Sequence, residues 1–307
     1  MTESDGVHTP ASLTRPSRMN PPAHDRTVGP GAGGRLPASR SGVHDLRGDP
    51  LMELNAHFQE HGYARLDRAF PAAAAADMAR ALWSALAERH GVDRDRPGTW
   101  APAEPRGLGA LSRKGVFDRL ASPAVVAAIG ALLGRADWPR PPDWGTALVT
   151  FPTPGEWDVP VGGWHIDYPA RGASGAGLLL KWLAYLAPVG PGGGGTVVLA
   201  GSHRLVEDFL RQADEADQGR SPAVRDAILG LHPWLRDLRR PGPAAERVAR
   251  LMGAGVSVSG VPVRVVELTG EPGDVVFMHP HLLHAAAPNR SAAPRFMVTG
   301  GAVEAKG

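Results

Sequence analysis

The second half of the chain consists of short apolar runs bounded by Gly and Pro, and this pattern limits the fold more than any other feature. Such runs, five to nine residues long, predict β-strands at 144–151, 164–168, 178–186, 196–200, 263–268, 274–278 and 295–299. The helical crossovers that a parallel sheet needs are missing from most of the gaps between the runs. The sequence therefore predicts an antiparallel sandwich or barrel.

The residues before these runs predict helices instead. A short helix that ends at Gly62, followed by a strand, is expected in LMELNAHFQEHGYARLDRAF. A long helix begins near Pro71 and ends before Gly91 in PAAAAADMARALWSALAERHG. A third helix, in SPAVVAAIGALLG, has Ser122 as its N-cap and Gly134 as its stop. We expect these helices to lie outside the β core.

Residues 204–255 interrupt the strand pattern with helical segments. One of them is SPAVRDAILG, in which Ser221 is the expected cap and Gly230 the expected stop. A helical insertion between two strands of a barrel usually lies over one mouth of the barrel. We therefore expect this insertion to form a lid.

Residues 1–46 are rich in Pro, Gly, Ser and Arg and show no apolar periodicity. A segment that buries little apolar surface cannot offset the entropy lost on ordering, so we expect a disordered tail. His8, His24 and His44 lie in this tail and are poor candidates for metal ligands. Residues 47–307 form the expected folded domain.

The charge balance excludes some classes of partner. The 33 basic and 31 acidic residues alternate along the chain, so no basic stripe indicates nucleic-acid binding. No apolar run is long enough to span a membrane, and the N-terminus lacks the apolar stretch of a secretory signal. We expect a cytoplasmic protein with no nucleic-acid or membrane partner, whose oligomeric state the sequence leaves open.

A His-x-Asp triplet, His165-Ile-Asp167, lies in the predicted strand WHIDY. Residues i and i+2 of a strand point to the same face, so both side chains are placed to hold one ion. The chain has no cysteine, so a metal would be held by His, Asp or Glu. A third ligand is available after the strand 274–278, where His279, His281 and His284 are close together. Two histidines and one carboxylate are the ligands of non-haem Fe(II) oxygenases.

The order of these residues resembles that in the phytanoyl-CoA dioxygenase family of Fe(II)/2-oxoglutarate oxygenases. That family has His-x-Asp, a long gap, a second His and an Arg about ten residues later. The matching residues here are His165 and Asp167, then His284 in LLHAAAPNRSAAPR, then Arg295.

Two further stretches extend the resemblance. GGGGTVVLAGSHR resembles the strand and Gly-Ser-His turn that follow the metal-binding strand, and HFQEHGYARLDRAF resembles the N-terminal opening of the family. The likeness covers roughly residues 55–302 in matching order. It implies a mainly β fold with flanking helices, namely a double-stranded β-helix (jelly roll, cupin-like).

The resemblance also implies roles for the four matched residues. His165, Asp167 and His284 would bind Fe(II), and Arg295 would hold the distal carboxylate of 2-oxoglutarate through two charge-assisted hydrogen bonds. The expected reaction uses O2 to hydroxylate, or otherwise oxidise at a C–H bond, a small molecule, with release of succinate and CO2. Relatives that halogenate lack the carboxylate, so Asp167 indicates that halogenation is not the reaction.

Lys181 is one of only three lysines, against 30 arginines, in a composition that is typical of a GC-rich bacterial genome and compatible with specialised metabolism. It interrupts LLLKWLAYL and shares a strand face with Leu183 and Tyr185. If that face is inward, its ammonium contacts the cosubstrate or an anionic group of the substrate. Alternatively, its stem covers apolar surface and its charge reaches water.

Several alternatives stay open from the sequence. His281 is the main rival of His284 as ligand, and His203 and Arg204 either line the site or stabilise a turn. Ala286 stands where the family often has a hydroxyl that helps to bind 2-oxoglutarate, and no coenzyme-A site is recognisable. A cupin-type metal enzyme that does not use 2-oxoglutarate, and a non-catalytic β-sandwich that binds a ligand, are the competing functions.

Overall fold

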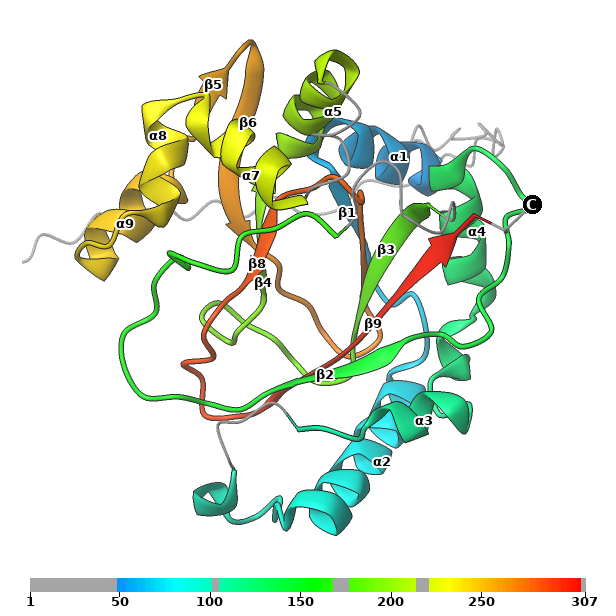
Figure 1. Cartoon of the computed structure of the whole chain (residues 1–307). Coiled ribbons are helices and arrows are strands. Elements are labelled where there is room, and N and C mark those ends of the chain that lie inside the picture. Colours follow the sequence, from blue (N-terminus) through cyan, green and yellow to red (C-terminus); the bar gives the residue numbers. More distant parts are fainter. Residues whose placement is uncertain (1–48, 101–104, 168–176, 214–220, 305–307) are drawn as a thin grey trace, which may run out of the picture. The chain divides into compact units, whose positions relative to one another are not determined.

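Two antiparallel sheets form the centre of the fold (Figure 1). The computed structural model describes residues 49–100, 105–167, 177–213 and 221–304, all within the unit Arg47–Gly307. The five-stranded sheet has the order β1 (Tyr63–Leu66), β7 (Val275–Met278), β3 (Leu178–Tyr185), β9 (Arg295–Val303) and β2 (Thr146–Thr150). The four-stranded sheet has the order β5 (Val256–Val258), β6 (Val261–Glu267), β4 (Thr196–Ala200) and β8 (His284–Ala286). This topology confirms the predicted double-stranded β-helix.

Both faces of the central strands are buried, and for this reason their sequences read as continuous apolar runs. In β3, Leu183 and Tyr185 pack between the two sheets, whereas Trp182 and Ala184 face helices on the outside. The outer helices of the five-stranded sheet are α1 (Pro50–His61), α2 (Ala72–His90), α3 (Gly109–Arg113) and α4 (Pro123–Leu133). Short 3-10 helices lie at Pro97–Thr99 and Asp118–Leu120.

The predicted helix boundaries are confirmed at the caps. The Ser122 hydroxyl accepts a hydrogen bond from the Val125 N–H at 3.1 Å, and Gly134 follows the last residue of α4 in a left-handed conformation. Gly62 and Gly91 end α1 and α2 in the same way.

The helical insertion covers the outer face of the four-stranded sheet. It contains α5 (Ser202–Gln212), α7 (Ser221–Gly230), α8 (Pro233–Arg236), a 3-10 turn (Asp237–Arg239) and α9 (Ala244–Leu251). Apolar residues of these helices form one buried cluster with Val197 and Leu199 of β4 and Ala285 of β8. Figure 1 shows α8 and α9 beside β5 and β6. The described part of the insertion therefore packs on a sheet, and its role as a lid stays a prediction.

The strand predicted at 164–168 is wrong for the residues that the structure describes. His165 makes only an isolated bridge to His284, and Trp164 and Ile166 both pack into the cluster under the insertion. Gly163 has a φ of +75°, which breaks an extended conformation directly before this run. Residue 168 lies outside the described residues.

Two short strands were not expected from the sequence. β5 pairs with β6 through a tight turn at Ser259 and Gly260, whose φ angles are both positive. β8 has only three residues, two of them alanine, which has little preference for strands. Both strands form because a neighbouring strand offers hydrogen bonds. The local sequence pattern does not indicate this pairing.

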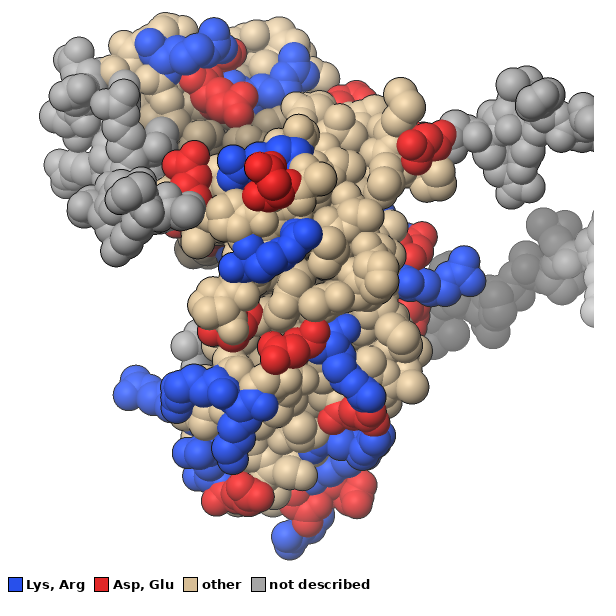
Figure 2. All heavy atoms as spheres, turned by 90° about the vertical axis from the view of Figure 1, so that its right-hand side faces the viewer, with Lys and Arg blue, Asp and Glu red and all other residues tan. Residues whose placement is uncertain are grey.

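The described surface agrees with the expected charge balance. Arginines and carboxylates are interspersed on the face that Figure 2 displays. None of the helices in the described residues has the length and apolar character needed to cross a membrane. The absence of a nucleic-acid partner stays a prediction, and the tail expected at 1–46 lies outside the described residues.

Candidate metal centre

A pair of backbone hydrogen bonds brings His165 and His284 together. The His165 N–H donates to the His284 carbonyl at 2.9 Å, and the His284 N–H donates to the His165 carbonyl at 3.0 Å. The two ring centroids lie 4.2 Å apart. Asp167 follows two residues later, and its Oδ1 lies 3.8 Å from His165 Nε2 and 3.5 Å from His284 Nε2. The three predicted ligands therefore converge, although they come from segments far apart in the sequence.

Hydrogen bonds to carbonyls fix the tautomer of both histidines. His165 Nδ1 lies 2.7 Å from the Gly163 carbonyl, and His284 Nδ1 lies 2.9 Å from the Leu282 carbonyl. A carbonyl only accepts, so each Nδ1 carries a hydrogen, and in the neutral imidazole the lone pair is then on Nε2. This is the arrangement that metal-binding histidines adopt.

The surroundings of His165 and Asp167 favour the charge states that a metal needs. Burial, and secondly the neighbouring His284, lower the pKa of His165, so its neutral imidazole persists at neutral pH. Burial disfavours the ionised form of Asp167, but His284 and the Lys181 ammonium outweigh it and hold the pKa of this carboxyl well below its ordinary value. Two imidazole nitrogens and one carboxylate thus lie close together. Their electron pairs repel one another unless a cation lies between them.

Lys181 supplies a cation at this place. It lies on β3, on the inward face, and its Nζ is 2.6 Å from Asp167 Oδ2 and 3.4 Å from His284 Nε2. Its side chain is only 18% exposed, so the alternative in which the charge reaches water does not apply. An ammonium held by a carboxylate and an imidazole lone pair shows that this set of atoms accepts a cation.

One cavity of about 480 Å³ contains most of these side chains. His165, Lys181, His284 and Arg295 line it together with apolar residues of β2. His203, Arg204 and the other described residues of the insertion are not among the lining residues. His203 instead contacts the Gln59 carbonyl through Nε2 at 3.1 Å, which favours the structural alternative for this residue.

Arg295, the first residue of β9, is 6% exposed and borders the same cavity. Its Nη1 donates to the Gly194 carbonyl, but its buried Nε has no hydrogen-bond partner among the described residues. Burial lowers the pKa of Arg295 to about 10, so the guanidinium is still charged at neutral pH. A buried cation with a free donor requires an acceptor that the described residues do not supply.

A second group of possible ligands, Glu207, His279 and His281, differs in its hydrogen bonding. The His281 N–H donates to His279 Nδ1 at 3.2 Å, so the hydrogen of His279 is on Nε2, which lies 3.2 Å from a Glu207 oxygen. This nitrogen donates to the carboxylate and has no lone pair for a metal. The tautomer of His279 is therefore unsuited to metal binding in this second group, whereas both Nδ1 atoms of the first group bind carbonyls.

Asn289 is a residue of the site that the sequence reasoning did not single out. It is fully buried, lines the cavity, and its Nδ2 donates to the carbonyls of Thr150 at 3.1 Å and Ala293 at 2.8 Å. Its Oδ1 accepts from the Ser291 N–H at 3.0 Å. Asn289 thereby fixes the loop between His284 and Arg295, and its position after Pro288 was the available signal for a turn.

Comparison with known families decides the relationship. The sequence profile described as phytanoyl-CoA dioxygenase matches residues 58–297, which is well over half of the chain. The chain belongs to the phytanoyl-CoA dioxygenase family. This confirms the resemblance drawn from its motifs. The candidate site residues His165, Asp167, Lys181, His284 and Arg295 all lie within the matched range. No curated protein sequence matches this family member.

Several solved structures are similar to this member of the phytanoyl-CoA dioxygenase family. The epimerase SnoN, in complex with Fe3+, alpha ketoglutarate and nogalamycin RO, is 18% identical over 82% of each chain, with a TM-score of 0.49. EctD from S. alaskensis with bound Fe is 19% identical over 82% of this chain and 76% of its own, with a TM-score of 0.48. AviO1 from Streptomyces viridochromogenes Tue57 is 17% identical over 81% of this chain and 92% of its own, with a TM-score of 0.46.

The Glu207–His279–His281 group generates a prediction about stability. Burial, with His203 and His281 nearby, lowers the pKa of His279 to about 3. Below pH 6.5 the unfolded chain binds a proton at His279 that the folded chain does not, so stability falls as the pH is lowered towards 3. We expect His279→Gln to reduce the pH dependence of the unfolding free energy by about 1.4 kcal/mol per pH unit between pH 4 and 6. Urea unfolding at several pH values measures this difference, and parallel curves for the two proteins would contradict it.

Proposed function

We propose that this protein is an Fe(II)- and 2-oxoglutarate-dependent oxygenase that hydroxylates, or otherwise oxidises at a C–H bond, a small molecule. The observation that carries the proposal is the convergence of two imidazoles and one carboxylate, with both imidazoles lining a cavity that the buried Arg295 also lines. Two histidines and one carboxylate on one side of an ion, with the other positions open, are typical of non-haem Fe(II) oxygenases.

His165, Asp167 and His284 are the proposed iron ligands. The Gly163 and Leu282 carbonyls accept from Nδ1 of the two rings, and the ion pair between Asp167 and the Lys181 ammonium supports binding of a cation at this group. When bound, Fe(II) together with 2-oxoglutarate supplies the activation of O2, with release of succinate and CO2. The presence of Asp167 leaves no open position for a halide, which favours hydroxylation or a related oxidation over halogenation.

Arg295 is the proposed partner of the distal carboxylate of 2-oxoglutarate. Its unpaired Nε needs an acceptor, and a carboxylate can accept two parallel hydrogen bonds from a planar guanidinium. Because Arg295 borders the cavity that His165 and His284 line, 2-oxoglutarate use is favoured over a cupin-type enzyme without this cosubstrate. Lys181 is the proposed second cation for an anionic group in the cavity.

The substrate is proposed to be small and partly apolar. Part of the cavity wall comes from β2 and from Leu108, and these lining residues are mostly apolar. These residues offer van der Waals contacts and few hydrogen bonds. They would therefore hold the carbon skeleton of a substrate near the metal rather than recognise a charged group.

Metal binding tests the assignment of the ligands. In an anaerobic titration with Fe(II) and 2-oxoglutarate, we expect wild type to give a weak visible charge-transfer band. His165→Ala and His284→Ala abolish the band because each removes one of three ligands, and Arg295→Ala weakens its dependence on 2-oxoglutarate. His281→Ala is the matched control and keeps the band. Wild-type titrations by all three site variants would refute the assignments, and failure of wild type to bind iron would favour the non-catalytic ligand-binding protein.

Lys181 generates a separate prediction. Its ammonium and a metal ion compete for Asp167, so we expect Lys181→Met to bind Fe(II) at least as tightly as wild type without 2-oxoglutarate. The same variant binds 2-oxoglutarate roughly tenfold more weakly, since a charge-assisted contact of about 1.4 kcal/mol is lost. Titrations of metal alone and of cosubstrate into the metal-loaded protein separate the two effects. Loss of metal affinity in Lys181→Met would overturn the competition.

A further inference from the structure

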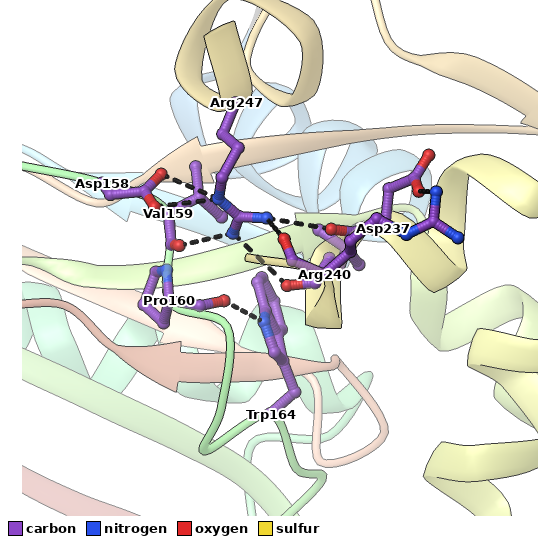
Figure 3. Close-up of polar contacts among 8 residues, drawn as sticks. Asp158, Val159, Pro160, Trp164, Asp237, Arg240 and Arg247 are labelled. Atoms are coloured by element: carbon purple, nitrogen blue, oxygen red, sulfur yellow. Dashed lines mark hydrogen bonds and ion pairs between the residues drawn. The ribbon is translucent and has the colours of Figure 1, made fainter. Parts of the chain in front are cut away.

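Arg247 is a buried cation in the helical insertion, far along the chain from the candidate metal ligands. It lies on α9, is 7% exposed, and is surrounded by acceptors from two different segments (Figure 3). Its Nε lies 3.1 and 2.8 Å from the two carboxylate oxygens of Asp158, and its Nη2 donates to the Val159 carbonyl at 2.7 Å. Its Nη1 donates to the carbonyls of Asp237, at 3.0 Å, and Arg240.

These contacts use the planar shape of the guanidinium. Nη1 binds carbonyls of the turn after α8, and Nε and Nη2 bind residues 158–159, so Arg247 connects the insertion to the segment that leads to the proposed metal ligands. A buried guanidinium is costly unless each donor has an acceptor, and here each nitrogen has at least one. A lysine carries the same charge on a single nitrogen and cannot reach both segments in this way.

The segment after Val159 has little packing of its own before it reaches the first ligand. Val161 is 41% exposed, and added Cβ atoms at Gly162 and Gly163 would meet nothing within 4 Å. The next fixed point is Trp164, which is buried and donates through Nε1 to the Pro160 carbonyl at 2.8 Å. Arg247 and Trp164 therefore hold the two ends of a loosely packed loop.

This loop supplies the carbonyl that orients His165. Gly163, at its end, accepts the hydrogen bond from His165 Nδ1 at 2.7 Å and so leaves Nε2 free for a metal. Gly163 has no side chain to fix its own position, so the placement of its carbonyl depends on the anchored residues on either side. Figure 3 shows Arg247 above Asp158 and Val159, with the Pro160–Trp164 contact following along the same segment.

We infer that Arg247 is a positioning residue for the metal centre, acting through Asp158, Val159 and the 160–164 loop on the orientation of His165. This inference rests on the proposed function for the identity of the centre. It also gives the helical insertion a role at the site. No described residue of α9 lines the cavity, but Arg247 connects this helix to His165 through the 160–164 loop.

The test compares Arg247→Lys with Arg250→Lys on the same helix. Arg250 pairs with Asp237 and makes none of the described contacts with residues 158–160, so Arg250→Lys controls for general changes in α9. Asp158→Asn removes the negative charge of the carboxylate that accepts hydrogen bonds from Arg247 Nε. We measure Co(II) and Fe(II) dissociation constants without 2-oxoglutarate, thermal unfolding, and hydrogen exchange of the amides at 158–167.

We expect Arg247→Lys and Asp158→Asn each to raise the metal dissociation constant about tenfold, as loss of an outer contact to a ligand does. The double variant is not additive, since both changes break one connection. Exchange becomes faster at 158–167 in both variants and is unchanged in Arg250→Lys. If Arg247→Lys does not fold, Asp158→Asn, whose side chain is 27% exposed, carries the test.

The outcomes separate the inference from the proposed function. Failure of wild type to bind either metal contradicts the proposed function. Metal binding by wild type with equal affinity in Arg247→Lys and Asp158→Asn overturns the positioning role alone. Equal weakening in Arg250→Lys also overturns it, because the effect is then a general property of α9.

Discussion

The site depends on the two hydrogen bonds between the backbones of His165 and His284. They extend the four-stranded sheet by a single pair of residues and place side chains from distant segments next to each other. Such a bridge needs no particular side chain, so it constrains the backbone and leaves both imidazoles free. The i−2 carbonyls then set the direction of each ring, and Asp167 is within reach because it follows His165 by two residues. One narrow backbone contact therefore brings the three proposed ligands together.

The electrostatic arrangement follows from the two sheets. The proposed metal ligands belong to the four-stranded sheet and the segment bridged to it, whereas Lys181 and Arg295 belong to the five-stranded sheet. Acceptors on one side of the cavity thus face cations on the other. In the protein alone, Lys181 compensates the Asp167 charge. In the half-buried group Glu207–His279–His281, the His279 ring shows the opposite hydrogen-bond pattern, and this contrast distinguishes the group from the proposed ligand set.

Sequence reasoning predicted the parts whose signals are local or belong to a family motif. The caps at Ser122 and Gly134 and the apolar run of β3 have local causes, and each was found where expected. The order of His165, Asp167, His284 and Arg295 came from the family motif. The strand predicted at 164–168 was wrong for the described residues because a short run bounded by Gly and Pro does not show whether a partner strand exists, and here only His165 forms a bridge. The role of Arg247 was not predicted, because its acceptors belong to segments far from it in the sequence or are backbone carbonyls.

The division of the site between two sheets has a consequence for how the protein can diversify. The proposed metal ligands and Arg295 belong to different sheets, and an apolar layer that includes Val198, Met278 and Met297 lies between these sheets. A change of volume in this layer would alter the distance from the proposed ligands to the guanidinium while every polar group stayed the same. If the proposed function is right, the apolar interior would thus act as a spacer that matches the site to the length of the molecule held across it.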